Sequence, residues 1–458
     1  MANRRHMIAL ALVGALTYVL VGPAAQGAPA AASREAGQSG PVPAAAPGDW
    51  TTYHHDNGRT GVAPDLGPLG TLSRAWTAAL DGAVFGQPLV VGARVFAATE
   101  NDTVFALDAA TGAVVWSAHV GTPVRRSALP CGNIDPLGIT STMVYDESTN
   151  LLFALAEQTG AQHMLVSIDA TTGQVVAQRP AEPPMGDRVA HQQRAALNLL
   201  GGRVYIAYGG LFGDCGNYIG SVVSLPTTGT GALTSFAIPT QREAGIWAPG
   251  GGTLVGGNLV YAVGNGAATS GTYDGSDSVV AVTPQLQLAD RFAPTTWPQD
   301  NAADLDLGSM TPALVGSFVY ADGKRGTAYT LRANQFGGIG GQVAQTAVCR
   351  AFGGPAVNAD TVYVPCADGL RAVRVTSTGQ LQVLWRGPAT GRGSPAVGGG
   401  AVWVVDYDGG TLFALDPATG AVRQQIAIGT APHFASPTLS GTRAYVGTVS
   451  GVVAIGGA

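Results

Sequence analysis

The chain is poor in charged residues, and its few basic residues form no cluster. Only 12% of its residues are Asp, Glu, Lys or Arg, and its formal net charge is -5 at pH 7. A protein that binds nucleic acid or an anionic membrane surface through charge carries a basic patch or stripe. Because no such patch is visible in the sequence, we exclude nucleic acid as a partner.

Long apolar runs are also absent after the N-terminus, where residues 1–28 predict a secretory signal peptide. Arg4 and Arg5 precede an apolar run of about 15 residues, which small residues follow. A membrane-spanning helix needs about 20 apolar residues, so we predict no transmembrane segment. The arginine pair leaves ordinary secretory and twin-arginine export both open. Residues 29–48, rich in Ala and Pro, predict a disordered leader, and we expect a secreted protein.

Cysteine is scarce, and its spacing excludes several metal and haem sites. The sequence has four cysteines, with no CxxC and no CxxCH motif, and no histidine lies at a ligand spacing from any of them. In an exported protein this number favours two disulfides over a metal site. Cys349 and Cys366 fall on neighbouring predicted strands, so we predict that pair, which leaves Cys131 with Cys215.

Glycine and proline, in contrast, are abundant along the whole chain, with 66 and 28 residues, and they punctuate a repeat. Residues 104–116 read VFALDAATGAVVW, and the phrase returns as LFALDPATGAVRQ at 412–424 and LVSIDATTGQVV at 165–176. The Asp of each D-x-x-T-G segment can accept backbone amides across a turn, and its Gly can adopt positive φ. Each copy therefore predicts a β-hairpin.

Weaker copies of the hairpin recur every 40 to 60 residues, roughly. A unit of this length with four short strands is typical of a β-propeller blade, and long amphipathic helix patterns are absent. We therefore predict an all-β, eight-bladed propeller over residues 49–458, or seven blades if the weak copy near Leu331 is not one. The equivalent strand positions are Leu107, Ile168, Leu225, Val282, Leu331, Val373, Leu415 and Ile455.

The two ends of the repeat predict how the ring closes. The last copy, at 451–455, lacks its D-x-x-T-G turn and its outer strand, whereas an unpaired outer strand occurs early, at 72–76. We predict that this N-terminal strand completes the last blade, so that no blade edge is left bare.

The repeat resembles the PQQ-binding-like propeller family, where PQQ is pyrroloquinoline quinone. That family includes quinoprotein alcohol dehydrogenases and the non-enzymatic outer-membrane assembly lipoprotein BamB. The resemblance covers roughly Trp50 to the C-terminus. It implies that the outer-strand tryptophans dock against the next blade, a role open here to Trp76, Trp116 and Trp385. A fold of this kind does not by itself establish catalysis.

Five residues occur along the sequence in the same order as the quinone-site residues of this family. The resemblance implies that Trp247 lies beneath the quinone, that Asn265 binds a metal, and that Lys324 contacts the quinone. The DLDLG stretch at 304–308 resembles the family's D-x-D-L-P segment, which implies that Asp304 is the general base and Asp306 a second metal ligand. Alcohol oxidation by PQQ requires Ca²⁺ or a lanthanide, a carboxylate base and a flat apolar platform.

The chain also departs from the family. The family's metal-binding glutamate has no counterpart in the segment GGLFGD at 209–214, where Asp214 is the possible substitute. No two cysteines are adjacent, and the missing CxxCH motif sets aside the quinohaemoprotein and polyvinyl-alcohol-dehydrogenase types. Structural explanations remain open: Trp247 filling space between blades, Asn265 forming a turn, Asp304 and Asp306 accepting loop amides, and Lys324 lying in solvent.

A second group of polar residues is a candidate lining for the channel. His191 and Arg194, with Asp214 and Tyr218, can line its mouth as a site for a sugar, peptide or anion, or can hydrogen-bond between blades. Our first functional prediction is an exported, monomeric propeller that binds a small molecule or protein in its channel without catalysis and without a cofactor. The alternative is a PQQ- and metal-dependent alcohol or sugar dehydrogenase. A BamB-like assembly role ranks third, because that role needs a lipid-anchoring cysteine and no cysteine directly follows the N-terminal apolar run.

Overall fold

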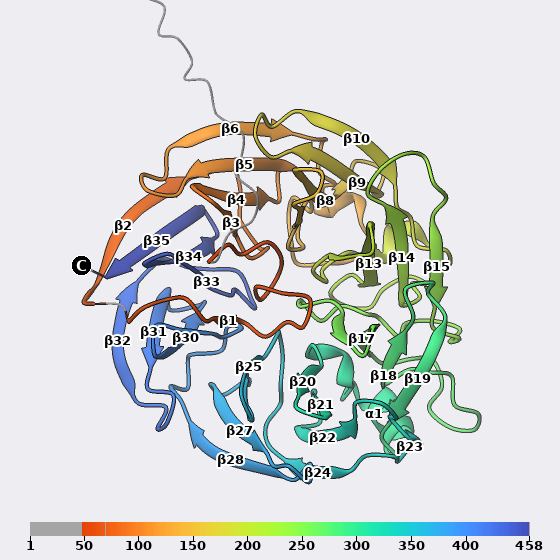
Figure 1. Ribbon diagram of the computed structural model, residues 1–458. Helices are drawn as coiled ribbons and strands as arrows, with labels where there is room; N and C mark the ends of the chain where they lie inside the picture. Colours follow the sequence, from red (N-terminus) through yellow and green to blue (C-terminus); the bar gives the residue numbers. More distant parts are fainter. Residues whose placement is uncertain (1–47, 69, 458) are drawn as a thin grey trace, which may run out of the picture. The chain divides into compact units, whose positions relative to one another are not determined.

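The repeating unit is a four-stranded antiparallel sheet, and eight such sheets form eight blades around a central channel (Figure 1). The computed structural model describes residues 48–68 and 70–457. These residues belong to the compact unit Ser39–Ala458. The predicted signal peptide and, apart from Gly48, the predicted leader lie outside the described residues.

Blades are numbered here along the chain, and each runs from an inner to an outer strand. Blade 1 contains β3 (Leu89–Val91), β4 (Arg94–Thr99), β5 (Thr103–Asp108) and β6 (Val114–His119); blade 2 contains β7 (Val144–Asp146), β8 (Leu151–Gln158), β9 (Gln162–Asp169) and β10 (Val175–Pro180); blade 3 contains β12 (Asn198–Leu200), β13 (Arg203–Gly210), β14 (Ser221–Pro226) and β15 (Thr234–Ala237); blade 4 contains β16 (Thr253–Val255), β17 (Asn258–Val263), β18 (Ser278–Val282) and β19 (Leu288–Ala293).

The second half of the ring has the same organisation. Blade 5 contains β20 (Ala313–Val315), β21 (Phe318–Ala321), β22 (Thr327–Arg332) and β24 (Ala344–Ala347); blade 6 contains β25 (Ala356–Asn358), β26 (Thr361–Val364), β27 (Arg371–Val375) and β28 (Leu381–Arg386); blade 7 contains β29 (Ala396–Gly398), β30 (Ala401–Asp406), β31 (Thr411–Leu415) and β32 (Val422–Ala427); blade 8 contains β33 (Thr438–Ser440), β34 (Arg443–Thr448), β35 (Gly451–Gly457) and β2 (Leu72–Ala79).

A few short elements lie outside this pattern. One α-helix, α1 (Trp297–Ala303), was not predicted from the sequence, and no helix in the described part of the chain is long and apolar enough to cross a membrane. The remaining elements are β1 (Val62–Ala63), β11 (His191–Gln192), β23 (Gly338–Ile339) and the 3-10 helices η1 (Arg126–Ala128), η2 (Arg188–Ala190) and η3 (Leu307–Ser309).

The D-x-x-T-G segments form hairpin turns as predicted, and they also join neighbouring blades. Asp108 Oδ1 accepts the backbone N–H of Thr111 at 2.9 Å, and Gly112 has a φ of +74°. The Trp76 ring packs so closely that a Cβ on Gly112 would stand 2.6 Å from it. Trp116 packs in the same way against Gly173, and Trp385 against Gly420. The turn glycine is therefore needed both for positive φ and for the approach of the adjoining blade.

The ring closes through the N-terminal strand, as the sequence predicts. β2 pairs antiparallel with β35, and Trp76 lies opposite Ala454. The weak copy near Leu331 forms a complete sheet, blade 5, which settles the count at eight rather than seven. In Figure 1, β2 is the outermost strand of the last blade, beside the C-terminus.

The closing contact predicts a measurable loss of stability in Trp76→Phe. Trp76 Nε1 donates to Ala109 O at 3.0 Å across the junction of blades 8 and 1. Losing this bond should lower the free energy of unfolding by about 1 kcal/mol, measured by urea titration. The matched control Trp385→Phe loses the same bond, to Pro417 O at 2.9 Å, between blades that the chain itself connects. A loss seen only in the control would show that β2 does not close the ring in solution.

A segment before β2 fills one end of the channel. Residues 50–66 cross the inner strands of several blades, seen in red and orange at the centre of Figure 1. Arg59, 2% exposed, donates to Leu197 O and Gly252 O at the starts of blades 3 and 4. His54, fully buried, contacts Pro355 O at 3.1 Å and Ser436 Oγ at 3.0 Å. Protein atoms therefore occupy this end of the channel.

Both predicted disulfides are present. Cys349–Cys366 joins the region between β24 and β25 to the end of β26, and Cys131–Cys215 joins the loop after β6 to the loop after β13. The second bond ties loops of blades 1 and 3 together. The described residues contain no free cysteine.

Candidate functional site

Residues from blades 4 and 5 meet where the second strands of the blades end. Asn265 follows β17, Lys324 follows β21, and Asp304 and Asp306 lie in the connection from β19 to β20. Helix α1 positions this connection: it begins with Pro298 in its first turn and ends at Asp304, whose φ of +53° is left-handed. Aspartate tolerates this conformation better than most residues, because its short polar side chain can bond locally.

Asp304 is the centre of a hydrogen-bonded cluster. Its Oδ1 accepts Asn265 Nδ2 at 2.7 Å and also accepts Lys324 Nζ. Lys324 Nζ lies 3.0 Å from Asp306 Oδ2 and 5.7 Å from the centroid of the Trp247 ring. Five of the residues singled out from the sequence are therefore adjacent in space, with the ammonium group between two carboxylates and over an indole.

The two aspartates differ in exposure, and this separates their chemistry. The side chain of Asp304 is 63% exposed, whereas that of Asp306 is 2% exposed. Burial raises the pKa of Asp306, and the Lys324 charge acts against this. Burial alone would lower the pKa of Lys324, but Asp306 and Asp304 outweigh it and raise that pKa. Lys324 is thus held as a cation, and Asp304 is the carboxylate that a molecule in solution can reach.

Two buried oxygens beside this cluster have no hydrogen-bond partner. They are Asn265 Oδ1 and Asp306 Oδ1. A buried acceptor without a donor costs about 1–3 kcal/mol, so such atoms call for an explanation. Amide and carboxylate oxygens are the ligands that Ca²⁺ and similar hard cations prefer. In the described chain no three His, Cys, Asp or Glu side chains converge as metal ligands. The cluster offers instead two carboxylates and one amide, which fits such a cation with an incomplete protein shell.

Trp247 forms a flat surface next to the cluster. Its loop is fixed by hydrogen bonds from Ile246 N to Tyr208 O at 3.0 Å and from Gly264 N to Gly245 O at 2.9 Å. Gly209 lies against the base of this side chain, where a Cβ would stand 2.8 Å from Trp247 Cβ. The indole is half-buried, so part of it is accessible to a molecule in solution.

Asp214, predicted as a substitute metal ligand, binds Tyr218 instead of joining the cluster. Tyr218 donates to Asp214 Oδ1 at 2.6 Å, and its ring occupies the space next to Gly210, where a Cβ would stand 2.2 Å away. Burial and the Asp214 charge raise the pKa of Tyr218. Tyr218 therefore occupies the space beside the 209–214 segment and takes up the Asp214 carboxylate.

Glu243 is a further carboxylate that the sequence analysis missed. Burial raises its pKa, the Arg242 guanidinium 2.9 Å away lowers it, and the charges of Asp214 and Asp304 raise it again. Glu243 has a φ of +70° in a turn outside the repeated hairpin, so neither strand pattern nor turn motif pointed to it. It adds negative charge on the side of the cluster that faces blade 3.

His191 and Arg194 do not form one polar site. His191 is buried, with Nδ1 2.9 Å from Asp187 O and Nε2 beside the Ile219 backbone, and burial lowers its pKa. These contacts join the turn at Asp187 to the segment at Ile219. The Arg194 guanidinium, in contrast, enters the channel and lies 5.6 Å from the Phe434 ring centroid.

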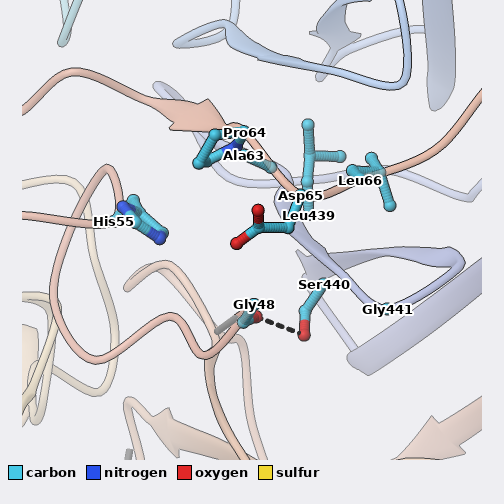
Figure 2. Close-up of a pocket in the computed structure, with 9 residues that line it drawn as sticks. All are labelled: Gly48, His55, Ala63, Pro64, Asp65, Leu66, Leu439, Ser440 and Gly441. Carbon is cyan, nitrogen blue, oxygen red and sulfur yellow. Dashed lines mark hydrogen bonds between the residues drawn. The ribbon is translucent and has the colours of Figure 1, made fainter. Parts of the chain in front are cut away.

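A separate small hollow lies beside the N-terminal segment. Figure 2 shows the side chains of His55 and Asp65 directed towards it, with Ser440 Oγ bonded to Gly48 O at 2.7 Å. Its volume is about 90 Å³. No residue of the Asp304 cluster lines it, and neither does His191 or Arg194, so we assign it no function.

Comparisons with known proteins agree with this architecture. The chain is 25% identical to a polyvinylalcohol dehydrogenase of Sphingopyxis sp. (strain 113P3) over 94% of this chain and 74% of that protein. Its fold is similar to a quinohemoprotein alcohol dehydrogenase from Comamonas testosteroni (TM-score 0.69, 16% identity, 90% and 81% of the two chains). It is also similar to a europium-containing methanol dehydrogenase (TM-score 0.65, 15% identity, 90% and 98%).

We set the polyvinyl-alcohol-dehydrogenase type aside from the sequence because the chain has no CxxCH haem motif. The propeller itself nevertheless resembles the polyvinylalcohol dehydrogenase of Sphingopyxis sp.. The family model described as "Outer membrane protein assembly factor BamB" matches residues 71–210 and 291–457, more than half of the chain. The chain therefore belongs to this family of PQQ-repeat β-propellers.

Proposed function

We propose that the protein is a PQQ- and metal-dependent dehydrogenase that oxidises the hydroxyl group of an alcohol or sugar. The observation that carries this proposal is the exposed Asp304 carboxylate, bonded to Asn265 and Lys324 beside the Trp247 ring. The similarity to proteins named as dehydrogenases also favours it over the non-enzymatic role that we placed first from the sequence.

Each residue then has a defined part. Trp247 is the platform, and Lys324, whose ammonium group lies over the indole, would donate to a quinone oxygen. Asn265 Oδ1, Asp306 Oδ1 and Asp304 are the oxygens that would hold the ion. When bound, PQQ supplies the electron acceptor and the ion supplies Lewis acidity. Quinone enzymes need all of these types of group, and here they come from blades 4 and 5.

Asp304 takes the hydroxyl proton in this scheme. Both described hydrogen bonds to its carboxylate use Oδ1, which leaves Oδ2 available to accept the proton. Asp306 cannot replace it, because its side chain is 2% exposed and is paired with Lys324. Asp306 instead holds Lys324 in place and keeps it charged.

Retention of the quinone tests the proposal directly. The purified protein is incubated with PQQ and either Ca²⁺ or La³⁺, free quinone is removed by gel filtration, and the retained absorbance is measured. We expect metal-dependent retention that Trp247→Ala lowers by about ten-fold or more, because stacking on an indole is lost. Trp385→Phe, in an outer strand, should bind normally. Absence of retention with either ion would reject the dehydrogenase.

The second candidate is recognition without catalysis. It is favoured by the ammonium group of Lys324, which already occupies the space between Asp304 and Asp306. In that case the channel binds a small molecule or partner, and no quinone is retained. With either function we propose an exported protein, because two disulfides are stable in an oxidising compartment.

A further inference from the structure

Phe434 has a strained backbone at the edge of the channel. Its φ is +68°, a conformation that costs an aromatic residue about 1–2 kcal/mol. Hydrogen bonds from Ala435 N to Pro432 O and from Ser394 N to Ala435 O, both 3.1 Å, hold the loop in this shape. Strained backbone of this kind is common at ligand-binding sites, so the Phe434 ring is a candidate ligand contact.

The ring of Phe434 faces Trp247 across the channel. Trp247 precedes the inner strand of blade 4 and Phe434 that of blade 8, on opposite sides of the ring of blades (Figure 1). Their centroids are 6.2 Å apart, and their planes are inclined by 47°. A flat molecule between two aromatic faces needs roughly 3.5 Å on each side, about 7 Å in total. Because the two planes are inclined by 47°, a side-chain rotation that makes them parallel and widens the gap by about 1 Å would admit it.

A cation without an ion-pair partner lies against the same ring. The Arg194 guanidinium is 5.6 Å from the centroid of Phe434 and 5.7 Å from that of Phe85. Its Nη2 donates to His433 O at 3.0 Å, which fixes its orientation, and its other hydrogen bond, to Thr140 O, is long at 3.5 Å. Unlike Lys324, which pairs with two aspartates, Arg194 forms no ion pair with any described residue. It can therefore bind an anion.

We infer that Phe434 and Trp247 form a clamp for a flat aromatic anion, with Phe434 as the second face and Arg194 as the partner of a carboxylate. The identity of the ligand as PQQ rests on the proposed function, whereas the ligand class follows from two facing rings and an unpaired guanidinium. Phe434 holds its positive φ in the loop that brings its ring to Trp247. The stacking energy of the ligand compensates for this strain when the clamp is filled.

Binding by variants of the full-length protein tests the clamp. Phe434→Asn removes the ring and tolerates positive φ, so it should fold, and Phe434→Tyr restores the aromatic face. The dissociation constants for PQQ and for a naphthalene dicarboxylate, a flat anion without redox activity, are measured by quenching of tryptophan fluorescence. We expect about ten-fold weaker binding of both probes by Phe434→Asn and near-normal binding by Phe434→Tyr. Arg194→Gln should weaken both probes and reduce the dependence of binding on salt.

Phe352→Ala is the matched control, because this ring contacts Arg350 in the corresponding loop before blade 6. Unchanged or tighter binding by Phe434→Asn would overturn the clamp, since the ring would then be neutral or an obstacle. Failure of the wild type to bind either probe would overturn it as well. Phe434-dependent binding without metal-dependent quinone retention would support the clamp and reject the dehydrogenase. Metal-dependent quinone retention that does not depend on Phe434 would support the dehydrogenase and reject the clamp.

Discussion

Replacing Asp304 by Asn is expected to lower the rate of PQQ-dependent dye reduction by about a thousand-fold, because a general base contributes 10²–10⁴-fold. Asparagine is the appropriate replacement for two reasons. It tolerates the φ of +53° at the end of α1, where alanine would be strained. It also keeps an acceptor oxygen for Asn265 and Lys324, so that the cluster stays assembled while the proton acceptor is lost.

The measurement is the steady-state reduction of an artificial electron acceptor with a panel of alcohols and sugars, at saturating PQQ and metal. Asp408→Asn is the matched control: Asp408 is 60% exposed and pairs with Arg392, much as Asp304 is 63% exposed and pairs with Lys324. Its activity should be unchanged. If Asp304→Asn kept more than a tenth of the activity while retaining quinone normally, Asp304 would not be the base.

The fold could be predicted because its signals are local. In the hairpin of Asp108 and Gly112, the Asp108 carboxylate accepts backbone amides within three residues of it. Neighbouring residues in the sequence therefore specify the turn. The closing strand was predictable for a different reason: the last copy lacks an outer strand, and the unpaired strand near Trp76 is the one segment that can supply it. Cys349 and Cys366 were paired correctly, although neither lies in a strand: Cys349 follows β24 and Cys366 follows β26.

The site was predictable only where it follows the repeat. Asn265 and Lys324 both come directly after second strands of blades, so a shared register brings them to the same end of the channel. Glu243 and Phe434 lie in loops whose positive φ depends on contacts with other blades, and no short-range pattern encodes this. The separation of His191 from Arg194 has the same origin, because β11 fixes the histidine on blade 3 while the arginine extends into the channel.

A second large effect is expected from three buried carboxylates between blades 1 and 2. Glu100 accepts Gly138 N at 2.8 Å and Thr140 Oγ1 at 3.1 Å, but its Oε1 and both oxygens of Asp102 have no partner. Burial raises the pKa of Glu100 to about 7, and burial with the Glu100 charge raises that of Asp102 to about 8. Burial also raises the pKa of Glu157, and the charges of Glu100 and Asp102 add to this increase.

The folded protein therefore retains protons that the unfolded chain releases above its ordinary pKa values of 4.5 and 3.8 for Glu and Asp. Stability from this source is fully present below about pH 4 and is lost as the pH rises through 7 to 8. At 1.36 kcal/mol for each pKa unit, the loss for Glu100 alone is on the order of 3 kcal/mol. The three groups interact, so their losses do not simply add.

Glu100→Gln is expected to flatten this decline. Glutamine keeps an oxygen for Gly138 N and cannot ionise, so the variant should match the wild type near pH 4 and exceed it by about 3 kcal/mol at pH 8. Urea titrations at pH 4, 7 and 8 measure the difference, with unchanged m-values as a check on two-state behaviour. Glu147→Gln, at an exposed position, should follow the wild type at every pH. If Glu100→Gln lost stability as steeply as the wild type, the pH dependence would have to come from groups outside this cluster.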